Sequence, residues 1–316
     1  MTAGLVAGQD YPRTYREFVT MFPDDKSCLS YLQKLRWPKV FICPACGIEN
    51  AAWSLTRNRL LCPSCRHQTT VIAGTIFDKT RTPLTTWFEA AWHLTTAKNG
   101  MSAKTLQKTL GTSYRVAWTL LQRYRVAMVC TDRKALSGNV EVDETFVGGV
   151  EHGAKRGRGA HKCIVVAAVE IMQPKGFGRI RLRHIPDASA NSLVAFVRET
   201  IEPGSVIITD GWLSYNTLPA YGYEHTKLVL SDSGDPAHIT MPGVHRVASL
   251  LKRWLLGTHQ GAVGASYLQA YLEEFTFRFN RRTSKNRGLL FRRLIDQAVC
   301  TGAVTETDLT SGDVWR

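Results

Sequence analysis

Two pairs of cysteines constrain the fold of this 316-residue chain more than any other feature. Cys43-Pro-Ala-Cys46 and Cys62-Pro-Ser-Cys65 are two C-x2-C turns with 15 residues between them. Four thiolates from two tight turns can surround Zn²⁺ as a tetrahedron and leave no open position for a substrate. Disulfides and reduced core cysteines are the alternatives, but a cytosolic chain disfavours disulfides and the paired spacing disfavours isolated core cysteines. The four cysteines therefore predict a structural zinc ribbon.

Charge is distributed unevenly along the chain. Residues 1–139 hold 19 Lys and Arg against 8 Asp and Glu, whereas residues 140–316 hold 21 against 18. The positive field of the first part attracts polyanions; nucleic acid is the leading candidate, and ribosomes and anionic lipid are alternatives. The longest apolar run, 163–169, is far shorter than the roughly 20 residues that span a bilayer, and no export signal begins the sequence. We expect a cytoplasmic protein without a membrane segment.

A helical pattern precedes residue 138. Residues 102–110, Gly111 and residues 112–128 have the order helix, glycine turn, helix, which is the sequence form of a helix-turn-helix. Arg115 lies at the start of the second helix, where such motifs enter the major groove, and Arg123 and Arg125 follow. The same helix pair is also a common packing unit. The positive charge favours the hypothesis that Arg115 and Arg123 contact DNA.

After Gly138 the hydrophobic pattern changes from helical to alternating. The predicted strands are 140–146, 162–172, 179–185, 205–209 and 223–230, and the predicted helices are 191–202, 214–218, 244–256 and 266–281. The first three strands follow one another directly and should form an antiparallel meander. Three strands followed by alternating helices and strands predict an α/β fold with a ribonuclease-H-like core, in which helices flank a mixed sheet.

Two aspartates lie at predicted strand ends. Asp143 interrupts the alternation of 140–146, and Asp210 follows the buried run 205–209. A buried charge is costly unless it is paired or binds a metal, and two such carboxylates can share the ions of two-metal phosphoryl transfer. Alternatively, Asp143 only ends a strand and Asp210 only forms a turn. Glu144 should face away from Asp143 because strand side chains alternate, so we leave it out of the predicted site.

Several motifs occur in an order that resembles one family. Besides the cysteine pairs they are Gly111-Thr-Ser-Tyr-Arg-Val-Ala-Trp118, Val142-Asp-Glu-Thr-Phe-Val-Gly-Gly149, Thr209-Asp-Gly-Trp212, Ser249-Leu-Leu-Lys-Arg253, and Tyr271-Leu-Glu-Glu-Phe275 running to Phe279-Asn-Arg-Arg282. Over residues 15–295 the chain resembles zinc-ribbon-bearing transposases of bacterial insertion sequences, the insertion sequence 1595 family, with a DDE-type, ISXO2-like domain. The resemblance implies a ribonuclease-H-like catalytic core, dependence on Mg²⁺ or Mn²⁺, and binding to terminal inverted repeats.

The DDE pattern also implies a third metal ligand on a helix, with Lys or Arg seven residues later. This sequence has His245 where Glu is usual, and Lys252 lies two helical turns beyond it on the same face. Replacing a carboxylate by imidazole removes a negative charge and should shift preference from Mg²⁺ toward Mn²⁺. Alternatively, His245 contacts DNA or packs, and Lys252 belongs to a basic face. The residues that could then complete the metal site are Glu141, Asp232 and Asp235. The predicted catalytic residues are Asp143, Asp210, His245 and Lys252, the first three of which would hold two ions.

Basic clusters are candidate DNA contacts. The glycine-rich stretch 148–162 is strongly cationic, and residues 278–293 carry seven Lys and Arg interleaved with phenylalanines. A linker and a solvated helix face are the alternatives. Within the ribbon, Arg57, Arg59, Arg66 and His67 are further candidates for phosphate contacts. The predicted DNA-binding residues are Arg115, Arg123, Lys155, Arg156, Arg158, Arg253, Arg278, Arg281 and Arg282.

These patterns together predict a DNA transposase. It should bind the terminal inverted repeats of an insertion sequence, cleave there with Mg²⁺ or Mn²⁺, and join the freed strand to target DNA, as a dimer or larger assembly because two ends must meet. The alternatives are a catalytically silent DNA-binding regulator derived from a transposase, and a junction-resolving or repair nuclease of the same fold. The predicted domains are a helical segment (1–42), a zinc ribbon (43–80), a helix-turn-helix-like segment (81–138), the ribonuclease-H-like transposase domain (139–297) and a tail (298–316).

Overall fold

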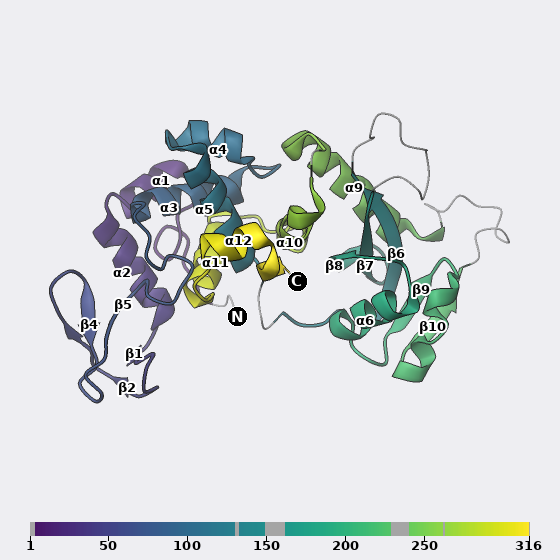
Figure 1. Ribbon diagram of the computed structural model, residues 1–316, viewed down its shortest axis with the longest axis horizontal. Helices are drawn as coiled ribbons and strands as arrows, with labels where there is room; N and C mark the ends of the chain where they lie inside the picture. Colours follow the sequence, from purple (N-terminus) through teal and green to yellow (C-terminus); the bar gives the residue numbers. More distant parts are fainter. Residues whose placement is uncertain (1–3, 130–132, 149–161, 229–239, 262, 316) are drawn as a thin grey trace. The chain divides into compact units, whose positions relative to one another are not determined.

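The chain folds into two compact units in a computed structural model that describes residues 4–129, 133–148, 162–228, 240–261 and 263–315 (Figure 1). The helical unit contains residues 1–130 together with residues 284–314, and the sheet unit contains residues 131–283. The helical unit is thus built from two separate stretches of sequence. No helix in the described ranges is both long and apolar enough to cross a membrane.

Polar side chains begin the helices of the helical unit. Ser102 and Ser113 accept hydrogen bonds from the N–H groups of the first turns of α4 and α5, and Thr14 and Asp24 do the same for α1 and α2. Gly111, between α4 and α5, has a φ of 63°, which glycine adopts without strain. The helices are α1 (Tyr15–Met21), α2 (Asp25–Arg36), α3 (Leu84–Thr96), α4 (Ala103–Leu110), α5 (Tyr114–Ala127), α11 (Arg287–Cys300) and α12 (Glu306–Ser311), with the 3-10 turn η3 (Asp313–Trp315) after them. The predicted helix, glycine turn, helix order is confirmed.

Helix α11 fills the core of the helical unit. The Phe291 side chain is fully buried, and its ring packs against the rings of Phe18, Phe88 and Trp92. The predicted end of the transposase domain at residue 297 therefore differs from the division into compact units, in which residues from 284 onward join the helical unit. The physical reason is that Phe291, one of the phenylalanines interleaved with the basic residues of 278–293, is an apolar core residue of the helical unit.

The zinc-ribbon segment consists of five short strands in two small sheets. β1 (Phe41–Ile42) pairs with β2 (Glu49–Asn50), and β4 (Arg59–Leu61) pairs with both β3 (Trp53–Ser54) and β5 (Gln68–Thr70). All three pairings are antiparallel. Each cysteine pair follows a strand directly, so the two C-x2-C turns lie at strand ends.

A five-stranded mixed sheet forms the sheet unit. Its strands are β6 (Asn139–Val147), β7 (Cys163–Ile171), β8 (Phe177–Ile185), β9 (Val206–Thr209) and β10 (Glu224–Lys227), in the order β10-β9-β6-β7-β8. β6, β7 and β8 form an antiparallel meander, whereas β9 is parallel to β6, and β10 is parallel to β9. This confirms the predicted meander and the α/β fold with a ribonuclease-H-like core. The predicted helix 214–218 is replaced by two short 3-10 helices, η1 (Leu213–Tyr215) and η2 (Leu218–Tyr221).

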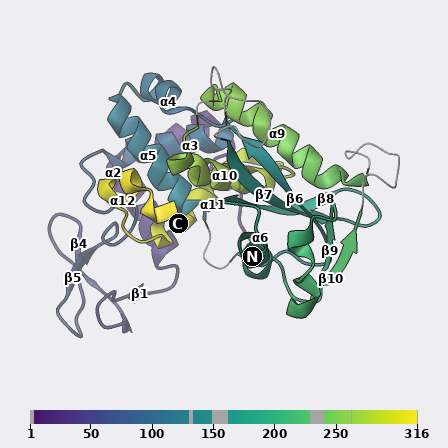
Figure 2. The same cartoon turned by 45° about the vertical axis from the view of Figure 1, so that its right-hand side comes forward.

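Helices cover both faces of this sheet (Figures 1 and 2). Val140 and Val142 of β6 pack in one core with α6 (Ala190–Thr200) and the 3-10 helices. Val147 of the same strand packs in the other core, with α9 (Pro242–His259) and α10 (Ala265–Phe279). Because strand side chains alternate, odd-numbered β6 residues face α9, and even-numbered residues face α6.

Candidate metal centres and DNA-contact residues

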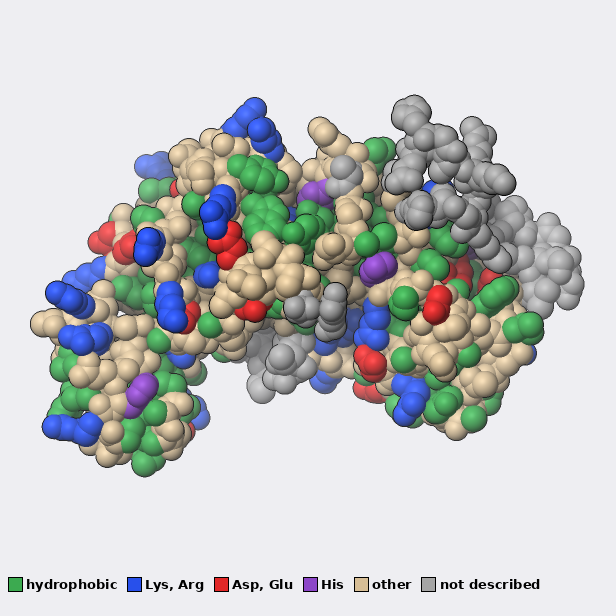
Figure 3. Space-filling view, viewed as in Figure 1, with side chains coloured by type: hydrophobic (Ala, Val, Ile, Leu, Met, Phe, Trp, Pro, Cys, Tyr) green, Lys and Arg blue, Asp and Glu red, His purple; other side chains and the backbone are tan. Residues whose placement is uncertain are grey.

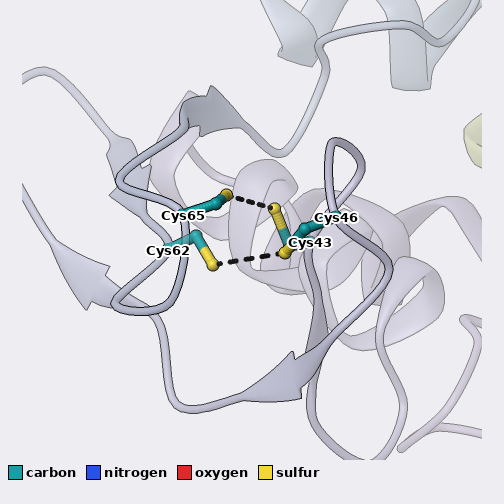
Figure 4. A group of neighbouring side chains, drawn as sticks. All are labelled: Cys43, Cys46, Cys62 and Cys65. Carbon is teal, nitrogen blue, oxygen red and sulfur yellow. Dashed lines mark hydrogen bonds between the residues drawn. The ribbon is translucent and has the colours of Figure 1, made fainter.

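The four predicted zinc ligands converge on one point (Figure 4). The Sγ atoms of Cys43 and Cys65 are 3.6 Å apart, those of Cys46 and Cys62 are 3.9 Å apart, and all four lie within 4.8 Å of one another. A tetrahedron with Zn–S bonds of about 2.3 Å has edges of about 3.8 Å. The arrangement therefore fits a structural Zn²⁺ ion with no open position.

Local backbone geometry prepares these thiols for a metal. Gly47 and Arg66 follow the two cysteine turns with φ values of 71° and 61°, and their N–H groups donate to the carbonyl oxygens of Cys43 and Cys62. The backbone N–H of Cys65 is the main cause that lowers the pKa of the Cys62 thiol to about 6, and the side-chain amide of Asn50 contributes from 3.2 Å. The N–H of His67 lowers the pKa of Cys65, but burial and hydrogen bonds with the other three thiols outweigh it, so that the pKa of Cys65 is instead raised. Cys62 is therefore the thiol of this pair that favours the thiolate, the form that binds Zn²⁺.

Strand register brings Asp143 and Asp210 to the same level of the sheet. β6 and β9 are parallel, with Glu141 opposite Ile208. Glu141 and Ile208 are the last pair of this register, and its continuation by two residues would bring Asp143 level with Asp210, which directly follows β9. Neighbouring strands are about 4.8 Å apart. Asp143 is two residues after Glu141 in β6, so both side chains lie on the same face of the sheet. Because Glu141 contacts α9, the Asp143 side chain is on the α9 face.

Three predicted residues act on the carboxyl group of a fourth, Asp143. Burial raises the pKa of Asp143 above its ordinary value, and the nearby charge of Asp210 adds to the rise. The Glu144 backbone N–H, which donates to Asp143 Oδ1 at 2.8 Å, lowers this pKa, as do the charges of His245 and Lys252. Asp143, Asp210, His245 and Lys252 therefore lie in one electrostatic neighbourhood of the sheet unit.

A buried carboxylate holds the start of the helix that carries His245 and Lys252. Glu141 is 4% exposed and accepts a hydrogen bond of 2.9 Å from the N–H of Val244 in the first turn of α9. Such N–H groups lack partners within the helix, and the positive end of the helix dipole favours a carboxylate there. Burial raises the pKa of Glu141, and this hydrogen bond opposes the rise. Glu141, an alternative third ligand, thus contacts the helix end, whereas Asp232 and Asp235 lie outside the described residues.

The Asp143 group is more open than the cysteine site. Within the described ranges, the four cysteines form the one group of three or more His, Cys, Asp and Glu side chains close enough together to hold a metal ion as they stand. On α9, His245 is half-buried and Lys252 is exposed. The assignment of Asp143, Asp210 and His245 as ligands of Mg²⁺ or Mn²⁺ stays a prediction.

The sequence did not predict the contact between Glu144 and Tyr215. Glu144 points to the opposite face from Asp143, as the alternation predicted, and there its carboxylate accepts a short hydrogen bond from the Tyr215 hydroxyl. Burial raises the pKa of Glu144 to about 7. Because Tyr215 belongs to η1, this bond ties the loop after Asp210 to β6. The only sequence signal was the position of Glu144 next to Asp143, since Tyr215 is remote in sequence.

The predicted helix-turn-helix arginines already have partners within the helical unit. Arg115 donates two hydrogen bonds, of 2.8 and 2.7 Å, to the carboxylate of Glu306 in α12. Arg123 is half-buried and donates to the carbonyl oxygen of Ile76, and Arg125 is 2% exposed. Of these three, Arg115 alone has a strongly exposed side chain, at 76%. Its contact with DNA stays a prediction.

The arginines at the end of α10 make local contacts. Arg278 donates to Glu274, Arg281 lies over the ring of Phe277, and Arg282 donates to the carbonyl oxygens of Phe177 and Gly178. These contacts account for part of the predicted basic cluster, and its role toward DNA stays a prediction. Arg253 is exposed on α9. Three predicted DNA contacts lie outside the described residues: Lys155, Arg156 and Arg158.

Basic side chains also mark the zinc ribbon, which forms the lobe at the lower left of Figure 3. Arg57, Arg59 and Arg66 are exposed there. Arg59 donates to Gln68, and the Arg66 guanidinium lies over the exposed ring of Trp53. The ribbon therefore presents both charge and an aromatic surface to solvent.

Comparisons with known proteins find two matching domain families in this chain. Residues 23–68 match the transposase zinc-ribbon domain, and residues 135–280 match the ISXO2-like transposase domain. An uncharacterized protein in transposable element ISH50 of Halobacterium salinarum is 24% identical over 279 residues, which cover 82% of this chain and 92% of the relative. An uncharacterized transposase-like protein of Haemophilus influenzae is 23% identical over 111 residues, or 35% of this chain and 89% of that protein.

One solved structure is also similar. The crystal structure of a pre-cleavage Mos1 transpososome matches 66% of this chain and 77% of that chain, with 14% identity. Its TM-score of 0.26 is too low to carry an argument. The two domain matches occur in order, belong to one family and together cover more than half of the residues. The chain therefore belongs to the insertion sequence 1595 family of transposases, with a zinc-ribbon domain and an ISXO2-like transposase domain.

Proposed function

We propose that this transposase binds the terminal inverted repeats of an insertion sequence and catalyses metal-dependent DNA cleavage and strand transfer. The observation that carries the proposal is the parallel register of β6 and β9, which supports a common position for Asp143 and Asp210. Asp143 is in the middle of β6 and Asp210 directly follows β9, and two like charges at half-buried positions of one sheet are costly. A divalent cation would remove that cost.

The donor set fits a divalent cation. Two carboxylates and one imidazole offer oxygen and nitrogen ligands. Burial and Asp210 raise the pKa of Asp143, and an added positive charge would lower it again. Asp143, Asp210 and His245 would hold two Mg²⁺ or Mn²⁺ ions. When bound, the ions would activate the attacking oxygen and stabilise the leaving oxygen. The single imidazole should favour Mn²⁺.

Residues around this set orient it. The Glu144 N–H fixes one oxygen of Asp143, and the Glu141 carboxylate fixes the first turn of α9 and so the approach of His245. Lys252 is exposed two turns further along the same helix. Its ammonium group would contact a DNA phosphate next to the carboxylates.

DNA would be bound by surfaces of both units. Arg115, the ribbon arginines and Arg253 are exposed, and each can neutralise a phosphate. Cleavage and joining need two element ends together, so we propose a dimer or larger assembly on DNA. The proposed location is the cytoplasm.

A matched pair of substitutions tests the proposal. Asp210→Asn removes a metal-ligand charge and should reduce nicking and joining of element-end DNA in Mn²⁺ at least about a thousandfold, with DNA affinity unchanged. Glu202→Gln removes an exposed carboxylate elsewhere in the sheet unit and should leave the rate unchanged. Equal rates for the wild type and Asp210→Asn would refute the site.

A second function is a DNA-binding regulator without catalysis, favoured by His245 in place of the usual Glu and by the open spacing of the Asp143 group. Calorimetric titration of the zinc-loaded protein with Mn²⁺ separates the two. The transposase should bind Mn²⁺ in a manner that Asp143→Ala abolishes, whereas the regulator should bind none.

A further inference from the structure

Three exposed apolar side chains follow the two aspartates along the chain. Phe146, three residues after Asp143, is 37% exposed; Trp212 and Leu213, two and three residues after Asp210, are 39% and 76% exposed. We call Phe146, Trp212 and Leu213 the apolar rim. A single exposed leucine needs no explanation. Three large exposed apolar side chains that closely follow two carboxylates in the sequence call for one.

Strand alternation and one hydrogen bond place the rim at a single edge of the sheet. Phe146 lies on the same face of β6 as Glu144. The Glu144 carboxylate accepts from Tyr215, and Tyr215 lies in η1 together with Leu213. Both parts of the rim therefore lie in the carboxyl half of β6, on the face that carries Glu144 and opposite to the face of Asp143.

Hydrogen bonds hold the loop that carries Leu213. The Trp212 N–H donates to Asp210 Oδ1 at 3.0 Å, and the indole N–H of Trp212 donates to the Ala188 carbonyl oxygen at 3.2 Å. The Ser214 hydroxyl donates to the same carbonyl oxygen at 3.0 Å. The loop thus presents Leu213 from an anchored backbone, and the chain length keeps the Cα atom of Leu213 within about 11 Å of that of Asp210.

We propose that Leu213, next to Trp212 in the anchored loop after Asp210, contacts the nucleobases next to the cleaved phosphate and unstacks the terminal base pair of the element. The inference rests on the proposed function, which puts that phosphate at Asp143 and Asp210. Successive nucleotides of a strand rise by about 3.4 Å, so bases within about three steps of the phosphate are in reach. Leucine side chains act as wedges between base steps, and aromatic rings stack on an exposed base. The ligand class is therefore an unpaired nucleobase.

Fluorescence of 2-aminopurine tests this contact. The probe is a duplex made from the DNA that flanks the coding region, with 2-aminopurine at the nucleotides on both sides of the junction between element and flank. Binding is measured by anisotropy without divalent metal, and cleavage is measured separately with Mn²⁺. Leu213→Ser is compared with Met172→Ser, because Met172 is 51% exposed in the same unit but follows β7, which ends at the opposite edge of the sheet.

We expect wild type and Met172→Ser to raise the fluorescence severalfold on saturation, and Leu213→Ser to bind without this rise and to cleave about tenfold more slowly. A mismatch at the terminal pair should restore cleavage by Leu213→Ser. An equal rise with Leu213→Ser, or no rise with wild type, overturns the proposal. A rise without any cleavage by wild type supports the base contact while the proposed function fails. Unchanged fluorescence together with a changed oligomeric state would assign the rim to a second copy of the chain, and overturns the proposal.

Discussion

A single glycine sets how closely α11 approaches the N-terminal segment of the helical unit. A Cβ atom on Gly288 would lie 1.5 Å from the backbone oxygen of Pro12, so backbone would have to move. We expect Gly288→Ala to lower the free energy of unfolding of the helical unit by about 3 kcal/mol, measured by urea denaturation with tryptophan fluorescence. Gly302→Ala, which meets nothing within 4 Å, is the control. A stability loss equal to that of Gly302→Ala would show that this close approach is not rigid.

A buried glutamate gives the sheet unit an acid-sensitive contact. Burial tends to raise the pKa of Glu170, but hydrogen bonds from Arg179 and from the N–H of Ser137 outweigh it and hold the pKa below its ordinary value. A lowered carboxyl pKa contributes stability that is complete above the unfolded value, about 4.5, and is lost as pH falls through the folded value.

Glu170→Gln should therefore destabilise the sheet unit by about 1–3 kcal/mol at pH 7, and the difference from wild type should shrink below about pH 4.5. Hydrogen exchange of β7 and β8, measured between about pH 2.5 and 7 and corrected for intrinsic exchange rates, gives this difference in stability between the variant and wild type. The exposed Glu202→Gln is the matched control. A destabilisation that stays constant over this range would contradict the titration of Glu170.

At the scale of elements, α12 occupies the arginine at the start of α5 that we propose to contact DNA. The pair between Arg115 and Glu306 is bidentate, but both side chains are largely exposed, at 76% and 44%, and exposed ion pairs contribute little stability. Glu306→Gln should therefore leave the melting temperature unchanged and tighten DNA binding severalfold at low salt, because the guanidinium becomes available to a phosphate.

Arg115→Ala should weaken DNA binding and reduce the slope of log K against log salt by about one. Fluorescence anisotropy over a salt series measures both variants. Glu49→Gln, an exposed carboxylate on β2, changes net charge equally and is the control. If Glu49→Gln tightens binding as much as Glu306→Gln, the effect is one of overall charge, and the contact between α12 and α5 plays no part.

Individual elements could be predicted from the sequence, and their long-range contacts could not. Alternation and helical spacing gave the strands around Asp143 and the helix that carries His245 to within a few residues, because these patterns are local. The parallel pairing of β9 with β6 depends on sheet topology, so only the structure supplies the register of Asp210 with Asp143. The bond between Glu144 and Tyr215 joins residues 71 apart. The predicted site does not include Glu144, because alternation tells which face a side chain occupies but not which residues it contacts there.

At the scale of the whole molecule, the sheet unit is an insertion in the helical unit. The chain leaves the helical unit near residue 130 and returns at residue 284, where α11 supplies Phe291 to a core otherwise made by residues before 130. The seven Lys and Arg of residues 278–293 predict a DNA-facing surface. The sequence could not show that α11 packs into the helical unit, because periodicity does not tell which partner an apolar stripe packs against. The two ends of the sheet unit are thus both joined to one folding unit, and the stability of that unit depends on residues from both sides of the insertion.

This arrangement predicts that the two units respond separately to a change in α11. Phe291→Ala should lower the free energy of unfolding of the helical unit by about 3–5 kcal/mol, because it leaves a cavity among Phe18, Phe88 and Trp92. Hydrogen exchange with mass spectrometry reads both units in one sample, so protection of α3 should fall while protection of β7 stays at the wild-type level. The sheet unit is therefore its own internal control. Equal loss of protection in β7 would mean that the inserted unit unfolds together with its host, and that the two compact units form one cooperative structure.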